Sequence, residues 1–147
     1  MYVTMSVDIE APPERVWQFL VEPEKAKAWF QALDEYTWTS EQSGVGSTFH
    51  WLETSGGRQY SIDFKTTEWE PPHVFGFTMV SGDFFKSYDE RWEIEATDSG
   101  SRFTFNDRIE FPYGPLGSVI GWFAARQAQE TGTKALAELK RLAEAGE

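Results

Sequence analysis

Cysteine is absent from the 147 residues of this chain, and histidine occurs only at positions 50 and 73. The missing thiols exclude disulfide bonds, a thiolate nucleophile and cysteine-ligated metal centres. Neither His50 nor His73 has a second ligand at a recognised metal-binding spacing. We therefore expect no metal site and no cofactor.

Basic residues are also scarce, since 13 Lys and Arg stand against 24 Asp and Glu, for a net charge of -11. Such a charge repels nucleic acids and anionic membrane surfaces. The longest apolar run, residues 119–125, is much shorter than the roughly 20 residues of a membrane span, and the first residues do not resemble a signal peptide. We expect a cytoplasmic protein with no nucleic-acid partner and no membrane span; its oligomeric state, monomer or homodimer, stays open.

Aromatic residues, in contrast, are abundant: the chain has 7 Trp, 12 Phe and 5 Tyr, which is 16% of its residues. A disordered chain carries far fewer rings, and 147 residues suit one hydrophobic core. No repeat, linker or low-complexity tract divides the sequence. We therefore expect residues 1–147 to form a single domain.

The pattern of apolar residues predicts the order of the elements. Apolar and polar residues alternate over residues 3–9, which is typical of a half-buried strand. Pro13 and Pro23 each predict the first turn of a short helix. Residues 36–111 contain about six strand-like segments separated by turn residues, and the pattern over residues 114–142 is that of a long amphipathic helix.

The turn at Gly56-Gly57 fixes one hairpin, because a slip of one residue would move every side chain to the other face of the sheet. A two-residue turn pairs Trp51 with Ile62 on one face. It also pairs His50 with Asp63 on the opposite, outer face. No serine is placed to complete a catalytic triad with them, so we expect a surface ion pair.

The same argument around Ser99-Gly100 pairs Trp92 with Asp107 and Glu90 with Ile109. Across Pro71-Pro72 an even turn continues the apolar face. Large rings on a curved sheet do not fill space efficiently against one helix, so we predict a cavity between the sheet and the C-terminal helix. The predicted ligand contacts are Trp51, Tyr60, Phe64, Phe77, Tyr88, Trp92, Phe105, Ile109 and Phe123.

The element order, together with several short motifs, resembles the START-like (SRPBCC) superfamily, and most of all its polyketide cyclase/dehydrase-type branch. The motifs are Val7-Asp8-Ile9-Glu10-Ala11-Pro12-Pro13-Glu14-Arg15-Val16-Trp17, Pro23-Glu24 with Trp29, Gly44-Val45-Gly46-Ser47, Trp69-Glu70-Pro71-Pro72, Gly100-Ser101-Arg102-Phe103-Thr104, Gly114-Pro115-Leu116-Gly117 and Ala137-Glu138-Leu139-Lys140-Arg141-Leu142. The resemblance implies an α+β helix-grip fold, in which a curved antiparallel sheet of about seven strands, with two short helices after the first strand, wraps around a long C-terminal helix. It implies a ligand cavity but no particular reaction, because the superfamily binds, carries or transforms very different molecules.

Two acids, Glu90 and Asp107, are predicted to point from the strands into this apolar cavity. A carboxyl group in apolar surroundings has a raised pKa and can act as a general acid or base. The alternative interpretation is structural: Glu90 lies in water at the cavity mouth, and Asp107 pairs with Arg126 or Arg15 to tie the helix to the sheet.

Other inward polar groups follow from the same alternation. Tyr60 and Tyr88 are placed to donate hydrogen bonds to a ligand carbonyl. Glu53 and Glu68 fall on the inner face as well, although both lie close to strand ends. Metal ligation is not expected from any of them.

Three functions fit these features. The first is binding of a small, largely apolar molecule, aromatic or polycyclic, in the cavity. The second is a cyclase/dehydratase-type enzyme in which Glu90 or Asp107 moves protons on an enolisable carbonyl substrate. The third is a protein-interaction module resembling chaperone activators, in which the acidic outer strand face at Asp89, Glu93 and Glu95 binds the partner.

Overall fold

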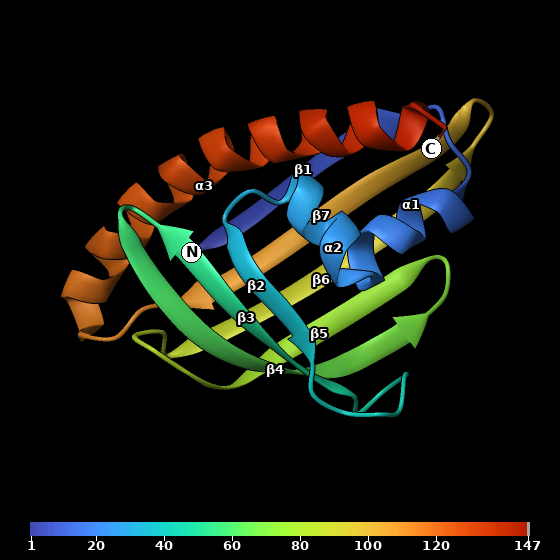
Figure 1. Cartoon of the computed structure of the whole chain (residues 1–147). Helices are drawn as coiled ribbons and strands as arrows, with labels where there is room; N and C mark the ends of the chain where they lie inside the picture. The colour runs from blue at the N-terminus through green and yellow to red at the C-terminus, as the bar shows by residue number, and fades with distance from the viewer. Residues whose placement is uncertain (147) are drawn as a thin grey trace.

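The computed structural model describes residues 1–146 and places one seven-stranded antiparallel sheet against three helices (Figure 1). The elements are, in chain order, β1 (Tyr2–Ile9), α1 (Pro13–Val21), α2 (Pro23–Trp29), β2 (Leu33–Trp38), β3 (Thr48–Ser55), β4 (Arg58–Glu70), β5 (Val74–Gly82), β6 (Ser87–Thr97), β7 (Gly100–Glu110) and α3 (Gly114–Glu144). The strand order β1-β7-β6-β5-β4-β3-β2 is a meander closed at one edge by β1. The predicted α+β helix-grip fold is confirmed.

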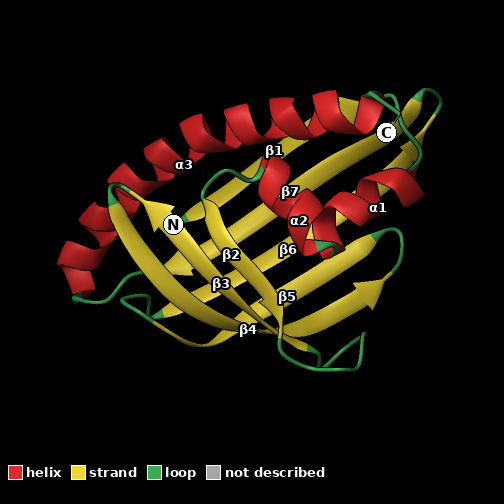
Figure 2. Ribbon diagram, viewed as in Figure 1, coloured by secondary structure: helices red, strands yellow, loops and turns green. Residues whose placement is uncertain are grey.

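The sheet curls into a half-barrel, and α3 lies along its β1 and β7 side (Figure 2). The short helices α1 and α2 follow β1 and also contact α3. Because α3 packs mainly on β1, the short helices cover part of the inner face of the middle strands: α1 contacts β6 and β7, and Trp29 of α2 packs on Trp92 of β6. None of the helices in the described part of the chain is long and apolar enough to cross a membrane.

The predicted hairpin between β3 and β4 is confirmed. Trp51 pairs with Ile62 and His50 with Asp63, and the turn glycines Gly56 and Gly57 both have positive φ values, 60° and 78°. A side chain is disfavoured in this left-handed conformation, so the glycines select the two-residue turn.

The predicted register of the β6–β7 hairpin is wrong by two residues. Thr97 pairs with Gly100, so the turn comes one residue earlier than predicted, and Glu90 lies directly opposite Asp107 instead of Ile109. Since the error is even, each side chain keeps its predicted face. The correction brings the two inward carboxyl groups into one cross-strand pair.

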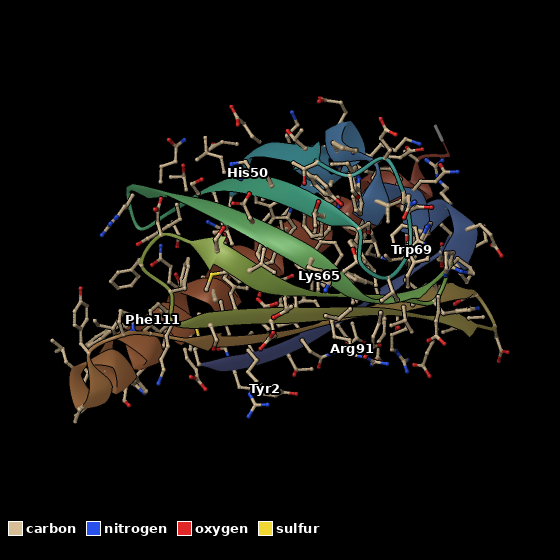
Figure 3. The ribbon with its side chains drawn as sticks, turned by 90° about the horizontal axis from the view of Figure 1, so that it is seen from below. Tyr2, His50, Lys65, Trp69, Arg91 and Phe111 are labelled. Carbon is tan, nitrogen blue, oxygen red and sulfur yellow. The ribbon has the colours of Figure 1, made fainter. Side chains whose placement is uncertain are left out.

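The expectation that Glu68 points inward is also wrong. The β4–β5 register shifts between Thr66 and Glu68, and the extra residue of this bulge reverses the alternation of the strand. Glu68 Oε2 accepts a hydrogen bond from Arg91 Nε at 2.8 Å. Figure 3 labels Arg91 and shows its side chain projecting away from the strands.

The core contains a dense group of rings at the end of the molecule where the short helices lie. Trp29 is 1% exposed and lies edge-on to Phe103, with centroids 5.9 Å apart, and Trp17 is edge-on to Trp69 at 5.2 Å. Edge-to-face pairs add stability beyond the burial of apolar surface. This end of the sheet is filled by side chains.

Two features hold α3 against the sheet. At Gly132 a Cβ atom would lie only 2.8 Å from Met5 Sδ and 3.1 Å from Phe105 Cζ, so the glycine permits the close approach of helix and sheet. Further along, Arg15 of α1 donates hydrogen bonds to the carbonyl oxygens of Leu142 and Ala143, at 3.2 and 2.6 Å. These carbonyls belong to the last turn of the helix, where intrahelical donors are missing.

Candidate functional site: a cavity with an acidic inner end

A cavity of about 750 Å³ lies between the sheet and the first two thirds of α3, from Ile120 to Ala135. The helix contributes Ile120, Ala124 and Ala128 to its wall, and further residues come from the β3–β4 turn, the β5–β6 loop and the end of α2. Figure 3 labels Phe111, another lining residue, where the chain passes from β7 towards α3. The volume falls within the range of about 300–1,000 Å³ that is usual for ligand pockets.

Most of the predicted ligand-contact residues line this cavity. They are Tyr60, Tyr88, Trp92, Phe105, Ile109 and Phe123. Both predicted acids, Glu90 and Asp107, line it as well.

Three of the predicted contacts do not line the cavity, namely Trp51, Phe64 and Phe77. They lie deeper, with exposed fractions of 0–1%, and pack on one another at centroid distances of 4.9 to 5.2 Å. The alternation of a strand predicts the face on which a side chain lies but not the depth at which neighbouring rings cover it. These residues support the cavity wall from behind.

Carboxyl groups from three strands meet at the cavity wall: Glu53 from β3, Glu90 from β6 and Asp107 from β7. The Tyr88 hydroxyl connects two of them, because it donates to Glu90 Oε1 at 2.9 Å and lies 3.5 Å from Glu53 Oε2. Glu90 is 4% exposed. We refer to Glu53, Glu90 and Asp107 as the acid cluster.

Burial raises the pKa of every member of the acid cluster. The pKa of Glu53 rises to about 8, chiefly through burial and then through repulsion by Asp107. Burial raises the pKa of Asp107 to about 7. The pKa of Glu90 is also raised, by burial first and by Asp107 and Glu53 next. Near neutral pH the cluster therefore holds protons that ordinary carboxyl groups have released.

The structural alternative for these acids does not match their surroundings. Arg126 stacks on the Trp122 ring, at 5.3 Å from its centroid, and Arg15 binds the end of α3. Among residues 1–146, no salt bridge reaches a member of the acid cluster. Asp107 Oδ1 is buried without a hydrogen-bond partner in the described part of the chain.

Some lining residues were not identified from the sequence. Glu53 was placed on the inner face, but its position near a strand end obscured its role, and the structure makes it a full member of the acid cluster. Trp29 and Phe30, at the end of α2, close the cavity from another side. The sequence indicates these two residues only as large rings at the end of a short amphipathic helix.

On the outer face, His50 and Asp63 form the predicted pair, with 2.9 Å between His50 Nδ1 and Asp63 Oδ1. The statement that no serine accompanies them is wrong, because Ser61 Oγ lies 3.4 Å from His50 Nε2. Ser61 points to the same face as Asp63, two residues along β4. The backbone N–H of Ser61 already donates to Asp83 Oδ2 at 3.1 Å, so it does not serve as an oxyanion donor.

The acidic outer strand face is partly neutralised. Arg91 forms ion pairs with Glu68 and with Glu93, and Asp89 accepts a hydrogen bond from the Thr78 hydroxyl. Interaction with a partner protein through this face stays a prediction.

Comparison with known families agrees with this geometry. The family described as "Polyketide cyclase / dehydrase and lipid transport" matches residues 2–144. The chain belongs to this family. The polyketide cyclase family assignment covers every strand and helix of the structure, and it confirms the resemblance seen in the sequence.

Relatives with curated sequences extend the comparison without adding an activity. The chain is 26% identical over 102 residues to the uncharacterised protein Rv2574 of Mycobacterium tuberculosis and to its counterpart Mb2604 of Mycobacterium bovis. The match covers 68% of this chain and 60% of those proteins.

Solved structures share the fold of this polyketide cyclase family member. TTHA0849 from Thermus thermophilus superimposes with a TM-score of 0.84 at 20% identity, over 99% of both chains. The Zhui aromatase/cyclase from Streptomyces sp. R1128 gives 0.78 at 13% identity, over 98% of this chain and 93% of that one. A START superfamily protein from Mycobacterium smegmatis gives 0.75 at 14% identity, over 99% of both chains.

Proposed function

We propose that this protein binds a small, largely apolar molecule, aromatic or polycyclic, in the cavity between the sheet and α3. The observation that carries the proposal is the combination of a cavity of about 750 Å³ and a wall made largely of rings, among them Trp29, Tyr88 and Trp92. Transfer of apolar ligand surface from water into such a site is favourable by about 25 cal/mol per Å². Family membership supports the same role.

A neutral fluorescent probe tests the proposal without knowledge of the natural ligand. N-phenyl-1-naphthylamine gains fluorescence when it enters an apolar site, and we expect saturable binding to the wild-type protein. Ala128→Trp places a large ring in the cavity wall and is expected to weaken probe binding at least about tenfold.

Ala137→Trp is the matched control, because Ala137 is exposed on the same helix and does not line the cavity. It is expected to bind the probe as the wild type does. Equal binding by both variants, or no saturable binding by the wild type, would contradict the proposal.

A second candidate function is proton transfer on an enolisable ketone, and the acid cluster is the observation that favours it. With a pKa of about 7, Asp107 is available as a carboxylate near neutral pH, while burial and the neighbouring acids raise the pKa of Glu90 well above its usual range and so favour its protonated form. Asp107 would remove a proton from the carbon beside the carbonyl, and Glu90 would donate its proton to the carbonyl oxygen.

Hydrogen–deuterium exchange of 2-tetralone in D₂O, followed by NMR, tests this function. We expect faster exchange in the presence of the wild-type protein and a loss of the acceleration of about 10²-fold or more in Asp107→Asn. The same exchange rate with and without protein would eliminate the enzymatic role and leave the binding role untouched.

A further inference from the structure

The acid cluster contains three carboxyl groups, and no positively charged group is paired with them among the described residues. Its three carboxyl groups come from three different strands. Tyr88 donates a hydrogen bond to Glu90 and lies 3.5 Å from Glu53. Glu90 also interacts through side-chain hydrogen bonds with Trp92 and Asp107. Asp107 Oδ1 is buried and unpartnered. Buried polar atoms are nearly always hydrogen-bonded in native proteins, so this oxygen is an acceptor left for something that enters the cavity.

The cations that line the same cavity are engaged elsewhere or exposed. The amino group of Met1 donates to the Ile109 carbonyl oxygen at 2.8 Å, and Lys134 is exposed on α3, as is the acidic Glu130. Arg58, which does not line the cavity, packs over the rings of Tyr60 and Phe84, at 5.3 and 5.5 Å from their centroids. No positively charged side chain of the described residues is paired with the acid cluster.

The acid cluster is not arranged as a metal-binding site. Among residues 1–146, no group of three or more His, Asp or Glu side chains is arranged to hold a metal. An organic cation fits the surroundings better, because the neighbouring walls are aromatic. Trp92, which is 1% exposed, and Tyr88 both line the cavity beside the acids, and the faces of aromatic rings attract organic cations.

We infer that the acid cluster binds the protonated amino group of a ligand whose remaining body is flat and apolar. This inference rests on the proposed function and assigns the ligand its polar end. An ammonium group has three N–H donors and no acceptor, which matches a site rich in carboxyl oxygens. The net charge of -11 also favours the approach of a cation over that of an anion.

A neutral ligand with a carbonyl or hydroxyl acceptor is the competing interpretation, and pH separates the two. A neutral acceptor needs protonated carboxyl groups, so its affinity falls as pH rises through the raised pKa values of Asp107 and Glu53, about 7 and about 8. An ammonium group needs ionised carboxylates. Its affinity therefore rises over the same range, and binding below that range releases protons.

A matched pair of ligands provides the test. 2-(Aminomethyl)naphthalene and 2-naphthalenemethanol have nearly the same shape, and only the amine is charged between pH 6 and pH 8. Both compete with N-phenyl-1-naphthylamine in fluorescence displacement, and calorimetry in two buffers counts the protons released. At pH 8 we expect the amine to bind at least about tenfold more tightly than the alcohol, with a smaller ratio at pH 6 and net proton release.

Asp107→Asn removes one charge without changing the shape of the side chain. It is expected to reduce the affinity for the amine about tenfold at pH 8, and to change the affinity for the alcohol by much less. The control is Asp98→Asn, which makes the same chemical change in the exposed β6–β7 turn. This control should change neither affinity.

The experiments distinguish failure of the amine inference from failure of the proposed apolar-ligand binding. If the alcohol binds as tightly as the amine at pH 8, or if Asp107→Asn leaves amine binding unchanged, the amine inference is overturned while the apolar-ligand proposal stands. If neither compound displaces the probe because no probe binds, both are overturned.

Discussion

The two halves of α3 have the same helical backbone but different surroundings. Towards the C-terminus, Leu136 and Leu139 are buried against the sheet and the short helices, with exposed fractions of 3% and 0%. Towards the N-terminus, Leu116, Trp122 and Phe123 are 57–62% exposed, and the residues that do face the sheet border the cavity. One helix thus completes the core at one end and forms a ligand wall at the other.

We therefore expect the C-terminal part of α3 to determine the stability of the fold and its N-terminal part to affect ligand binding. Close packing contributes most to stability where large side chains are fully buried, and the cavity end does not offer such contacts. The following experiments test whether the separation is as sharp as the structure indicates.

Truncation at the packed end should have the largest effect. Leu139→Ala removes a fully buried side chain and is expected to lower the free energy of unfolding by about 2–5 kcal/mol. Leu116→Ala makes the same change at the cavity end and should alter it by less than about 0.5 kcal/mol. Urea denaturation measures both, and similar losses in the two variants would contradict the comparison.

Gly132 marks a position where the helix closely approaches the sheet. Gly132→Val would place methyl groups against Met5 and Phe105, and overpacking of this kind is expected to cost about 1–3 kcal/mol of unfolding free energy. Thr133→Val introduces the same side chain at the exposed neighbouring position and serves as the control. If Gly132→Val leaves the free energy of unfolding unchanged, the contact between helix and sheet at this position is loose.

The acid cluster should make the protein less stable as pH rises. Below about pH 4 the folded and unfolded states both hold the proton of Glu53. Between pH 5 and 8 the unfolded chain has released it, whereas the folded protein, in which the pKa of Glu53 is about 8, retains it. The free energy of unfolding therefore falls over this range, and Glu53→Gln should reduce the fall by at least about 1.4 kcal/mol, the equivalent of one pKa unit.

Denaturation curves at pH 5.5 and 8.5 measure this effect. Asp8, Asp34 and Asp63 have lowered pKa values, so they are ionised in both states above pH 5 and do not contribute to the difference. Glu35→Gln, at an exposed position of β2, should leave the pH dependence as it is in the wild type. A wild-type stability that does not fall with pH would contradict the burial of the cluster.

The smallest effect is expected at the exposed end of α3. Phe123 lines the cavity and the adjacent Trp122 does not. Phe123→Ala should weaken probe binding by about 1 kcal/mol, roughly fivefold, while Trp122→Ala leaves binding within about twofold. Neither variant should shift the unfolding midpoint, and equal effects on binding would place the cavity wall elsewhere.

Much of the fold could be predicted from local patterns. Period-two alternation assigned the strand faces, and Gly56-Gly57 fixed a hairpin because its backbone conformation is nearly unique to glycine. The β6–β7 register could not be fixed in the same way, since a shift by two residues leaves the alternation unchanged. For the same reason the direct Glu90–Asp107 pairing was visible only in the structure.

The candidate site was predictable to a lesser degree. The sequence placed Glu90, Asp107 and Tyr88 on the inner face, but alternation does not measure depth, and so it did not separate Trp51, which lies in the core, from Trp92, which lines the cavity. The bulge that turns Glu68 outward has no clear signature in the sequence. Convergence of distant strands on one point, which creates the acid cluster, depends on the curl of the whole sheet.

The hydrogen bonds from Arg15 to the last carbonyl groups of α3 have a mechanical consequence. They fix the C-terminal end of α3, whereas few buried side chains hold its N-terminal end. Displacing the first turns would break the contacts of Gly117 and Gly121 with Phe111 and Pro112, whereas displacing the last turns would open the core. We therefore expect the size of the largest ligand to depend on how far the first turns of α3 can move away from the sheet, and not only on the cavity volume in this structure.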